Sequence, residues 1–261
     1  MNPFDPWNLV NLSGDGTMRG VTIALPTDRV RDFLPKGLEL GPQSITPPGT
    51  HPIMLGFHDM FRLKLSIPSP LPNMTYREHS VGVPFAYVTD GAVTASSPGP
   101  YFFMPTLLLD NVFATLGGVL LWGLPKKLAQ FDARDGHYSV LSQGGEPLVT
   151  ATWNAAGEFR HIREFEHFEP IRQALCQPLI GMMPLSLGPF FVVADFPKRW
   201  DLAMMRPLEM VVEVHTDYVL GFSSGRYPKQ HMSLGITESI LGSYELRVQW
   251  MMSAPYPPLP R

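Results

Sequence analysis

Prolines and glycines interrupt this chain along its whole length, and their spacing limits what it can fold into. The 28 prolines and 23 glycines do not gather in one tract, and the apolar runs between them are short. Because proline cannot continue a helix or donate within a central strand, such a chain favours short strands joined by turns. Runs with strand character include 21–25, 53–59 and 147–153. We therefore expect an α+β fold that is mainly antiparallel β, with a few short helices.

The amino-acid totals favour one domain with a large core. Of the 261 residues, 44% are hydrophobic and only 16% are charged. We interpret residues 1–261 as a single domain, with the polar, turn-rich residues 1–16 as an extended N-terminal arm. The net charge of −3 gives no reason to expect a nucleic acid partner. The single cysteine, Cys176, excludes a disulfide within the chain.

Targeting and membrane signals are weak in this sequence. The N-terminus has no basic segment followed by an apolar segment, so it does not resemble a secretory signal. No apolar run reaches the length of about 18 residues that a membrane-spanning helix needs. We therefore expect a cytoplasmic protein without a membrane partner.

The histidines invite a metal interpretation, which their spacing does not favour. His161 and His167 lie among four glutamates, but these residues alternate with phenylalanines and lack the spacing of metal ligands. No glycine-rich phosphate-binding or dinucleotide-binding motif occurs either. We expect no metal and no cofactor.

The most informative stretch is uncharged over residues 111–125 and then carries two adjacent lysines, Lys126 and Lys127. Asp110 is a good N-cap, apolar residues follow at helical spacing, and Gly123 is a stop signal. This pattern predicts a short helix. Because the helix is apolar all round, we expect it to be buried. Its end would then bring the lysine pair to the edge of an apolar interior.

A lysine at such an edge can become a nucleophile if its pKa falls. In water the pKa of lysine is about 10.4, so the amine is almost fully protonated. Burial lowers this pKa, and so does a second cation nearby. Two unit charges about 4 Å apart repel by about 4 kcal/mol at an effective dielectric constant of about 20, which is worth about 3 pKa units. The alternative is an exposed turn with two solvated charges.

The stretch also carries a family resemblance. Leu109-Asp110-Asn111, Gly118 and Pro125-Lys126-Lys127-Leu128 resemble the catalytic segment of the acetoacetate decarboxylase family, which has these residues at the same spacing. The resemblance implies that Lys126 forms a Schiff base with the substrate and that Lys127 lowers its pKa. Acetoacetate decarboxylase is the established example of an amine activated in this way.

A second similarity to the family lies at Tyr76-x-Glu78, which precedes an apolar strand. The family has a Tyr-x-Glu there, and its glutamate lies in the active site. Residues two apart on a strand share one face, so Tyr76 and Glu78 would form a pair that handles protons. The alternative is a strand edge with a solvated glutamate.

The family pattern breaks at three places. Met18 occupies the position of an arginine that helps to handle the substrate carboxylate, and Arg19, one position away on a strand, would face the other way. A second active-site glutamate of the family falls at or near Ile53, and an Arg-Glu pair is replaced by Val119-Leu120. These changes make the expected pocket more apolar and weaken the case for a substrate as small and anionic as acetoacetate.

The resemblance implies a Schiff-base lyase that decarboxylates a β-keto acid. Two alternatives remain: an aldolase-dehydratase or cyclase that uses the same lysine on a larger keto acid, and a β-barrel that binds an apolar ligand without chemistry. The resemblance also implies a barrel-like fold, a keto acid or ketone as ligand, and a homo-oligomer. The expected site residues are Lys126, Glu78 and Tyr76 as catalytic groups, Lys127 as the group that tunes the pKa, and Trp122 and Arg19 as substrate-binding groups.

Overall fold

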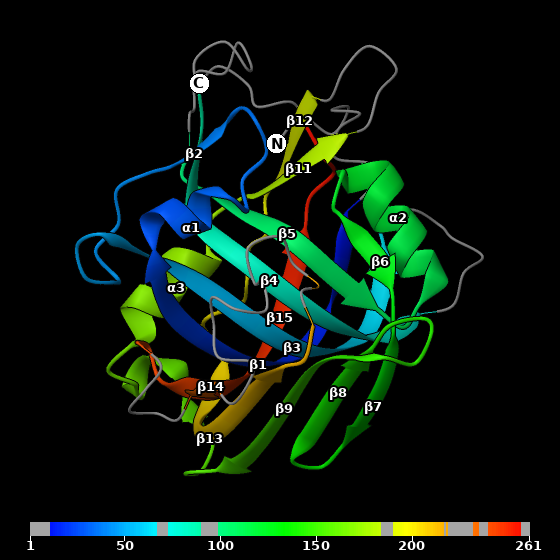
Figure 1. Cartoon of the computed structure of the whole chain (residues 1–261). Coiled ribbons are helices and arrows are strands. Elements are labelled where there is room, and N and C mark those ends of the chain that lie inside the picture. The colour runs from blue at the N-terminus through cyan, green and yellow to red at the C-terminus, as the bar shows by residue number, and fades with distance from the viewer. Residues whose placement is uncertain are drawn as a thin grey trace.

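The computed structural model describes residues 11–66, 73–89, 99–183, 190–216, 218, 232–234 and 240–256. Within these residues the chain forms one large β-sheet of 15 strands and three short α-helices (Figure 1). This architecture confirms the expected class, mainly antiparallel β with a few short helices.

The strands are β1 (Leu12–Pro26), β2 (Leu38–Leu40), β3 (Thr50–Leu65), β4 (Met74–Val88), β5 (Tyr101–Leu109), β6 (Lys126–Leu128), β7 (Gln130–Arg134), β8 (His137–Leu141), β9 (Pro147–Ala155), β10 (Arg160–His161), β11 (Leu179–Met183), β12 (Phe190–Ala194), β13 (Met204–Val214), β14 (Met232–Leu234) and β15 (Ser243–Met252). The helices are α1 (Thr27–Arg31), α2 (Val112–Trp122), α3 (Phe168–Leu175) and the 3-10 helix η2 (Ile162–Glu164).

The strands pair in the order β12-β11-β5-β4-β3-β1-β15-β13-β9-β8-β7, and β2, β6, β10 and β14 attach to single strands of this path. The β11–β5 and β5–β6 pairs are parallel, whereas the other pairs are antiparallel. Figure 1 shows the long strands β1, β3, β4 and β5 lying side by side and strongly curved. Among the described strands the path stays open at β12 and β7, so these strands do not close a hydrogen-bonded ring.

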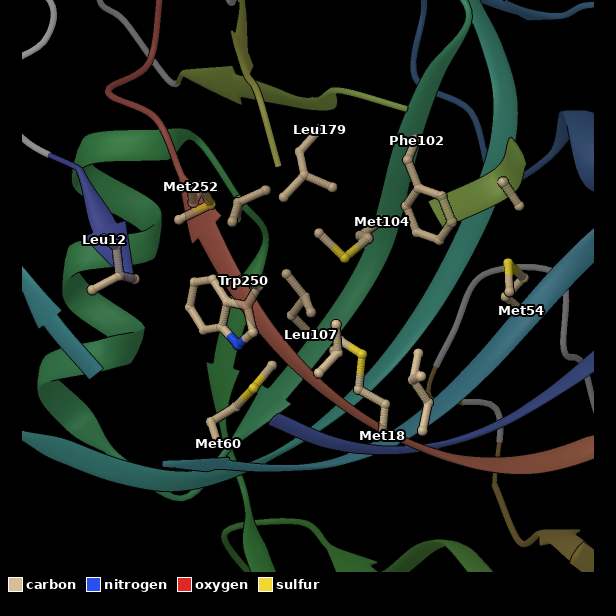
Figure 2. Packing of buried hydrophobic residues seen from close by; sticks show 14 of the residues in the cluster. Leu12, Met18, Met54, Met60, Phe102, Met104, Leu107, Leu179, Trp250 and Met252 are labelled. Carbon is tan, nitrogen blue, oxygen red and sulfur yellow. The ribbon is translucent and has the colours of Figure 1, made fainter. Parts of the chain in front are cut away.

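The buried apolar residues within the described part of the chain form three clusters, and the long strands β1 and β3 separate two of them, because successive side chains of a strand point to opposite faces. Met18 of β1 and Met60 of β3 belong to one buried cluster, which also contains Trp250 of β15 (Figure 2). Val21 of β1 and Phe57 of β3 belong to a second cluster on the opposite face. Figure 2 shows that the side chains of the first cluster converge from strands far apart in the sequence.

Helix α2 begins and ends close to the expected positions. Its N-cap is Asn111, whose side chain accepts a hydrogen bond from the backbone N–H of Ala114 at 3.0 Å. Asp110, the expected cap, instead accepts a hydrogen bond from the backbone N–H of Arg77 at 2.8 Å. Gly123 ends the helix with a φ of 60°, a left-handed conformation that glycine adopts without strain.

The expected burial of α2 is wrong. Five of its apolar side chains are exposed, and Leu120 is 65% exposed. The helix buries Ala114, Thr115, Gly118 and Trp122 and presents the rest of its surface outward. The sequence correctly indicates a helix that is apolar all round, but the described residues cover only one side of it. The exposed residues are Val112, Phe113, Leu116, Leu120 and Leu121.

The N-terminal segment also differs from the expectation of an extended arm over residues 1–16. Residues 12–16 are the first residues of β1 and pair with both β3 and β15. Residues 1–10 lie outside the described residues. Within the part of the chain that the structure describes, no helix has the length and apolar character needed to cross a membrane.

Candidate active site

Lys126 reaches the interior from β6, directly after the turn that ends α2. Its backbone lies opposite Leu107 of β5, in a short parallel pair. The aliphatic part of its side chain passes close to Gly118, where an added Cβ would lie only 2.3 Å from Lys126 Cδ. The glycine of the family-like segment therefore leaves the space that the lysine side chain occupies.

The structure brings together Lys126, Glu78 and Tyr76, the three side chains expected to be catalytic. Lys126 Nζ donates a hydrogen bond to Glu78 Oε2 at 3.0 Å, and the side chains are only 8% and 9% exposed. The ammonium lies 5.5 Å from the centroid of the Tyr76 ring. Tyr76 and Glu78 share one face of β4 and are both buried.

The pKa of Lys126 does not follow the expectation of a lowered value. Burial is the largest single influence and lowers it, but the Glu78 carboxylate and Tyr76 together outweigh burial. The pKa of Lys126 therefore lies above its ordinary value. Burial also raises the pKa of Tyr76, to about 12, so the phenol stays protonated near neutral pH. In this arrangement the resting lysine is an ammonium ion paired with Glu78.

Lys127 lies away from this group. It follows Lys126 on β6, where successive side chains point to opposite faces, and it is exposed. The residues that line the pocket around Lys126 do not include Lys127. The two lysines are neighbours in the sequence, but the strand separates their side chains.

His58 lies beside Glu78 in the middle of the sheet. Met18 of β1 pairs with His58 of β3, and His58 pairs with Glu78 of β4, so the three residues form a row across three strands. His58 Nε2 lies 2.7 Å from Ser80 Oγ, whereas its buried Nδ1 has no hydrogen-bond partner among the described residues. Burial lowers the pKa of His58 to about 4, so the ring is neutral near pH 7.

These groups line a small, mainly apolar pocket of about 80 Å³. A cavity needs roughly 10–15 Å³ of such free space to hold one water molecule. The pocket therefore has room for a short organic acid. Four of the lining residues are methionines, whose flexible side chains can move to admit a somewhat larger ligand. The apolar lining is formed by Leu12, Met18, Met60, Phe102, Met104, Leu107, Leu124, Leu175, Leu179, Phe196, Trp250 and Met252.

A second lysine, Lys198, also lines the pocket. It is 8% exposed, and burial lowers its pKa to about 7. Lys198 and Trp250 also line an adjacent open groove of about 600 Å³, which carries the exposed cations Arg62, Lys64 and Arg199.

Neither of the two expected substrate-binding residues lines the pocket. Arg19 faces the other side of β1 and forms ion pairs with Asp59 at 2.8 Å and Glu245 at 3.1 Å. Trp122 is buried, but its Nε1 donates to the backbone carbonyl of Ser253 at 2.9 Å. The opposite orientation of Met18 and Arg19 agrees with the strand alternation expected from the sequence, and it leaves the pocket without an arginine from β1.

Sequence reasoning missed His58, Ser80 and Lys198. Ile53, the position expected to replace a second glutamate of the family, is fully buried in the cluster on the other face. The residue of β3 that stands opposite Glu78 is His58, and this follows from strand register, which the sequence does not display. Lys198 lies in a Phe-Pro-Lys-Arg-Trp segment that carries no signal of burial.

The arrangement can carry out amine chemistry on a carbonyl compound, because a shielded lysine is held against a carboxylate inside an apolar pocket. No three His, Cys, Asp or Glu side chains within the described residues are grouped so that they could hold a metal ion. The fold and the site therefore define a mainly antiparallel β protein built around an interior lysine.

Comparison with known proteins identifies the family. The family model described as acetoacetate decarboxylase matches residues 1–171. The chain belongs to the acetoacetate decarboxylase family. A search of curated proteins found no match.

Solved structures of this family share the fold. The enduracididine biosynthesis enzyme MppR, complexed with the condensation product of pyruvate and imidazole 4-carboxaldehyde, matches with a TM-score of 0.61 and 14% identity over 94% of this chain and 88% of that chain. An acetoacetate decarboxylase from Legionella pneumophila matches with a TM-score of 0.57 and 15% identity over 98% and 92%. An acetoacetate decarboxylase-like enzyme from Sphingomonas wittichii RW1 matches with a TM-score of 0.57 and 12% identity over 96% and 94%.

Proposed function

We propose that this protein is a Schiff-base-forming lyase that acts on a keto acid through Lys126, with decarboxylation of a β-keto acid as its reaction. The observation that carries the proposal is the Lys126–Glu78 pair, 3.0 Å apart and buried in an apolar pocket. The family to which the chain belongs supports the reaction class. The small pocket supports a short substrate.

The first step makes Lys126 nucleophilic. Because the resting amine is protonated, Glu78 takes a proton from Nζ along the 3.0 Å hydrogen bond. The neutral amine attacks the ketone carbon of the substrate and forms a carbinolamine. Glu78 then returns the proton to the carbinolamine hydroxyl, which leaves as water, and an iminium ion remains on Lys126.

The second step breaks the carbon–carbon bond. Electrons from the bond to the carboxylate flow into the iminium, which gives carbon dioxide and a neutral enamine. A proton taken up from solvent through Glu78 is added to the enamine carbon, and water hydrolyses the resulting iminium to release the ketone. Each turnover therefore takes up one proton. Tyr76 is protonated near neutral pH and lies beside Lys126, so it supports these proton transfers.

Borohydride trapping tests the proposal. The protein is treated with acetoacetate or pyruvate and then with borohydride, and the modified peptide is identified by mass spectrometry. We expect a reduced adduct at Lys126 that is absent in Lys126→Arg and retained in Lys64→Met, which removes an exposed lysine. If no ligand produces an adduct at Lys126, the proposal is wrong. Binding of an apolar ligand without an adduct would support the non-catalytic alternative.

A second candidate reaction is an aldol-type condensation and dehydration that keeps the carboxylate of the keto acid. The observation that favours it is the structural likeness to MppR complexed with a condensation product of pyruvate. The iminium on Lys126 would lose a proton from its methyl carbon to Glu78 instead of losing carbon dioxide, and the resulting enamine would attack an aldehyde. Incubation with acetoacetate, and separately with pyruvate and an aldehyde, distinguishes the two by the release of carbon dioxide or the formation of a condensation product.

We also propose that the protein assembles as a homo-oligomer, with α2 in the interface. The five exposed apolar side chains of α2 lie on one helix, and contiguous apolar surface of this kind marks interaction sites. Light scattering coupled to size-exclusion chromatography tests this proposal. We expect Leu120→Glu with Phe113→Glu to yield monomers from a larger wild-type species, and a monomeric wild type would contradict it.

A further inference from the structure

Lys198 reaches the pocket from a segment that the reaction described above does not use. It follows β12, and its backbone forms an isolated antiparallel bridge with Trp250 of β15. Lys198 and Trp250 both line the pocket that contains Lys126. Because Lys198 is 8% exposed, its ammonium group is largely removed from water.

The ammonium group of Lys198 has two oxygen acceptors among the described residues. Its Nζ donates to the carbonyl oxygen of Leu175 at 2.5 Å and to that of Phe196 at 3.1 Å. A lysine ammonium carries three N–H groups, and the third has no oxygen acceptor among the described residues; the ammonium also lies 3.8 Å from the centroid of the Phe196 ring. None of the ion pairs found within the described residues includes Lys198. This buried cation therefore has backbone and aromatic partners but no carboxylate partner in the part of the chain that the structure describes.

We propose that Lys198 binds the carboxylate of the keto acid whose carbonyl carbon reacts with Lys126. This inference rests on the proposed function and names the group that makes the pocket selective for acids. A substrate carboxylate accepts the third N–H and supplies the missing counter-ion, and charge-assisted hydrogen bonds of this kind are the strong ones. A neutral ketone of the same size has no carboxylate, so it offers neither this charged acceptor nor the counter-ion.

Three further observations support this arrangement. Lys126, Lys198 and His58 line the same pocket, so both lysine side chains border one space. The free space of this pocket, about 80 Å³, is small, so a short acid that fills it lies close to the residues that line it. The buried Nε1 of Trp250, which has no hydrogen-bond partner among the described residues, offers another donor in the lining.

A purely structural role is the competing explanation. Leu175 is the last residue of α3, and a cation stabilises the carbonyl end of a helix. Such a role accounts for the contacts of Lys198 with the two carbonyl oxygens. It does not predict any difference between an acid and a neutral ketone, so the test must compare ligands and not only variants.

The test measures how much ligand is needed for half-maximal borohydride trapping at Lys126. Acetoacetate is compared with 4-methylpentan-2-one, in which an isopropyl group replaces the carboxylate and the number of heavy atoms is unchanged. The variants are Lys198→Met, which removes the charge, and Lys198→Gln, which keeps a donor for the helix carbonyl. Lys64→Met is the matched control, because it removes an exposed lysine that lines the adjacent groove.

We expect both Lys198 variants to raise the half-maximal concentration of acetoacetate by about tenfold or more, the range for losing a hydrogen bond to a charged group. The half-maximal concentration of 4-methylpentan-2-one should stay within about twofold of the wild-type value. An unchanged value for this ketone would also show that the site of the variants is folded. The Lys64→Met control should behave as wild type. An equal change for both ligands, or no change for either, would overturn the inference. Wild type that forms no adduct at Lys126 would instead overturn the proposed function, and with it this inference.

Discussion

The Lys126 ammonium and the Glu78 carboxylate lie 3.0 Å apart, with side chains that are 8% and 9% exposed. Each group is the counter-ion of the other in a pocket whose lining is otherwise mainly apolar. The pair therefore keeps the resting amine protonated and also provides the base that can remove its proton. In our proposal activation comes from proton transfer within this pair, and the amine is not kept neutral in advance.

Replacing Glu78 by Gln should separate these two effects. Loss of the carboxylate removes the strongest influence that raises the pKa of Lys126, so burial should then lower it. We expect the pH of half-maximal trapping at Lys126 to move down in Glu78→Gln. Turnover of a β-keto acid should fall about 10²–10⁴-fold, because general acid–base catalysis is lost.

The matched control for this prediction is Glu245→Gln. Glu245 is 3% exposed and pairs with Arg19 and Arg206 on the opposite face of the sheet. This variant also removes a buried, paired carboxylate, but not one in the pocket. The trapping pH should not change in Glu245→Gln. An unchanged or higher trapping pH in Glu78→Gln would contradict the role assigned to the pair.

The stability of the protein should also depend on this pair. Removing one partner of a buried ion pair leaves the other charge without compensation and costs about 3–5 kcal/mol. We expect Lys126→Met and Glu78→Leu each to lower the free energy of unfolding by roughly this amount. The free energy of unfolding of the double variant should fall by far less than the sum of the losses in the two single variants. Urea denaturation of the four proteins measures this coupling, and additive losses would show that the two charges do not interact.

The sequence predicted that Lys126, Glu78 and Tyr76 lie together, because local motifs contain them. Tyr76 and Glu78 share a face because strand residues two apart always do, and the family-like segment placed Lys126 in the interior. The same alternation placed Lys127 on the other face, so the neighbour in the sequence is not the neighbour in space. The partner that does most to raise the pKa of Lys126 is Glu78, which is 48 residues away in the sequence.

The rest of the site depends on information that a sequence does not contain. His58 stands beside Glu78 only because of the register between β3 and β4. Lys198 is buried because its backbone pairs with Trp250, although its segment has the composition of a surface turn. The apolar sequence of α2 indicates surface that needs to be covered, but not whether the same chain covers it.

The two glycines in the middle of α2 offer a direct test of the geometry around Lys126. A Cβ added at Gly118 would lie 2.3 Å from Lys126 Cδ, so Gly118→Ala must displace the lysine side chain and disturb its contact with Glu78. We expect trapping at Lys126 to fall at least about tenfold, because small displacements of reacting groups have large effects.

Gly117→Ala is the internal control for Gly118→Ala. Apart from its chain neighbours and the backbone of its own helix, no atom of the described residues lies within 4 Å of a Cβ built at Gly117. Alanine in a helix interior is more favourable than glycine by about 0.5–1 kcal/mol, so this variant should be slightly more stable than wild type and fully active. Thermal unfolding and trapping measure the two properties. Equal trapping by both variants would mean that Gly118 does not shape the position of Lys126.

The burial of Lys198 should make stability depend on pH in a characteristic way. Its pKa is lowered from 10.5 to about 7 in the folded chain. Between these values the unfolded chain binds a proton that the folded chain has released, so the free energy of unfolding should rise with pH, by at most about 1.4 kcal/mol per unit. The cost of burying the charged amine is thus fully present below about pH 7 and disappears as the pH rises toward 10.5.

The difference in unfolding free energy between wild type and Lys198→Met isolates this contribution, because groups that titrate alike in both proteins cancel. Measured by urea denaturation from about pH 7 to about pH 9, the difference should shift in favour of wild type as the pH increases. Lys64→Met should give a curve parallel to that of wild type, since Lys64 is exposed. If the Lys198→Met curve is also parallel to wild type, Lys198 titrates as a solvated amine. Its ammonium would then have no need of a substrate carboxylate as counter-ion.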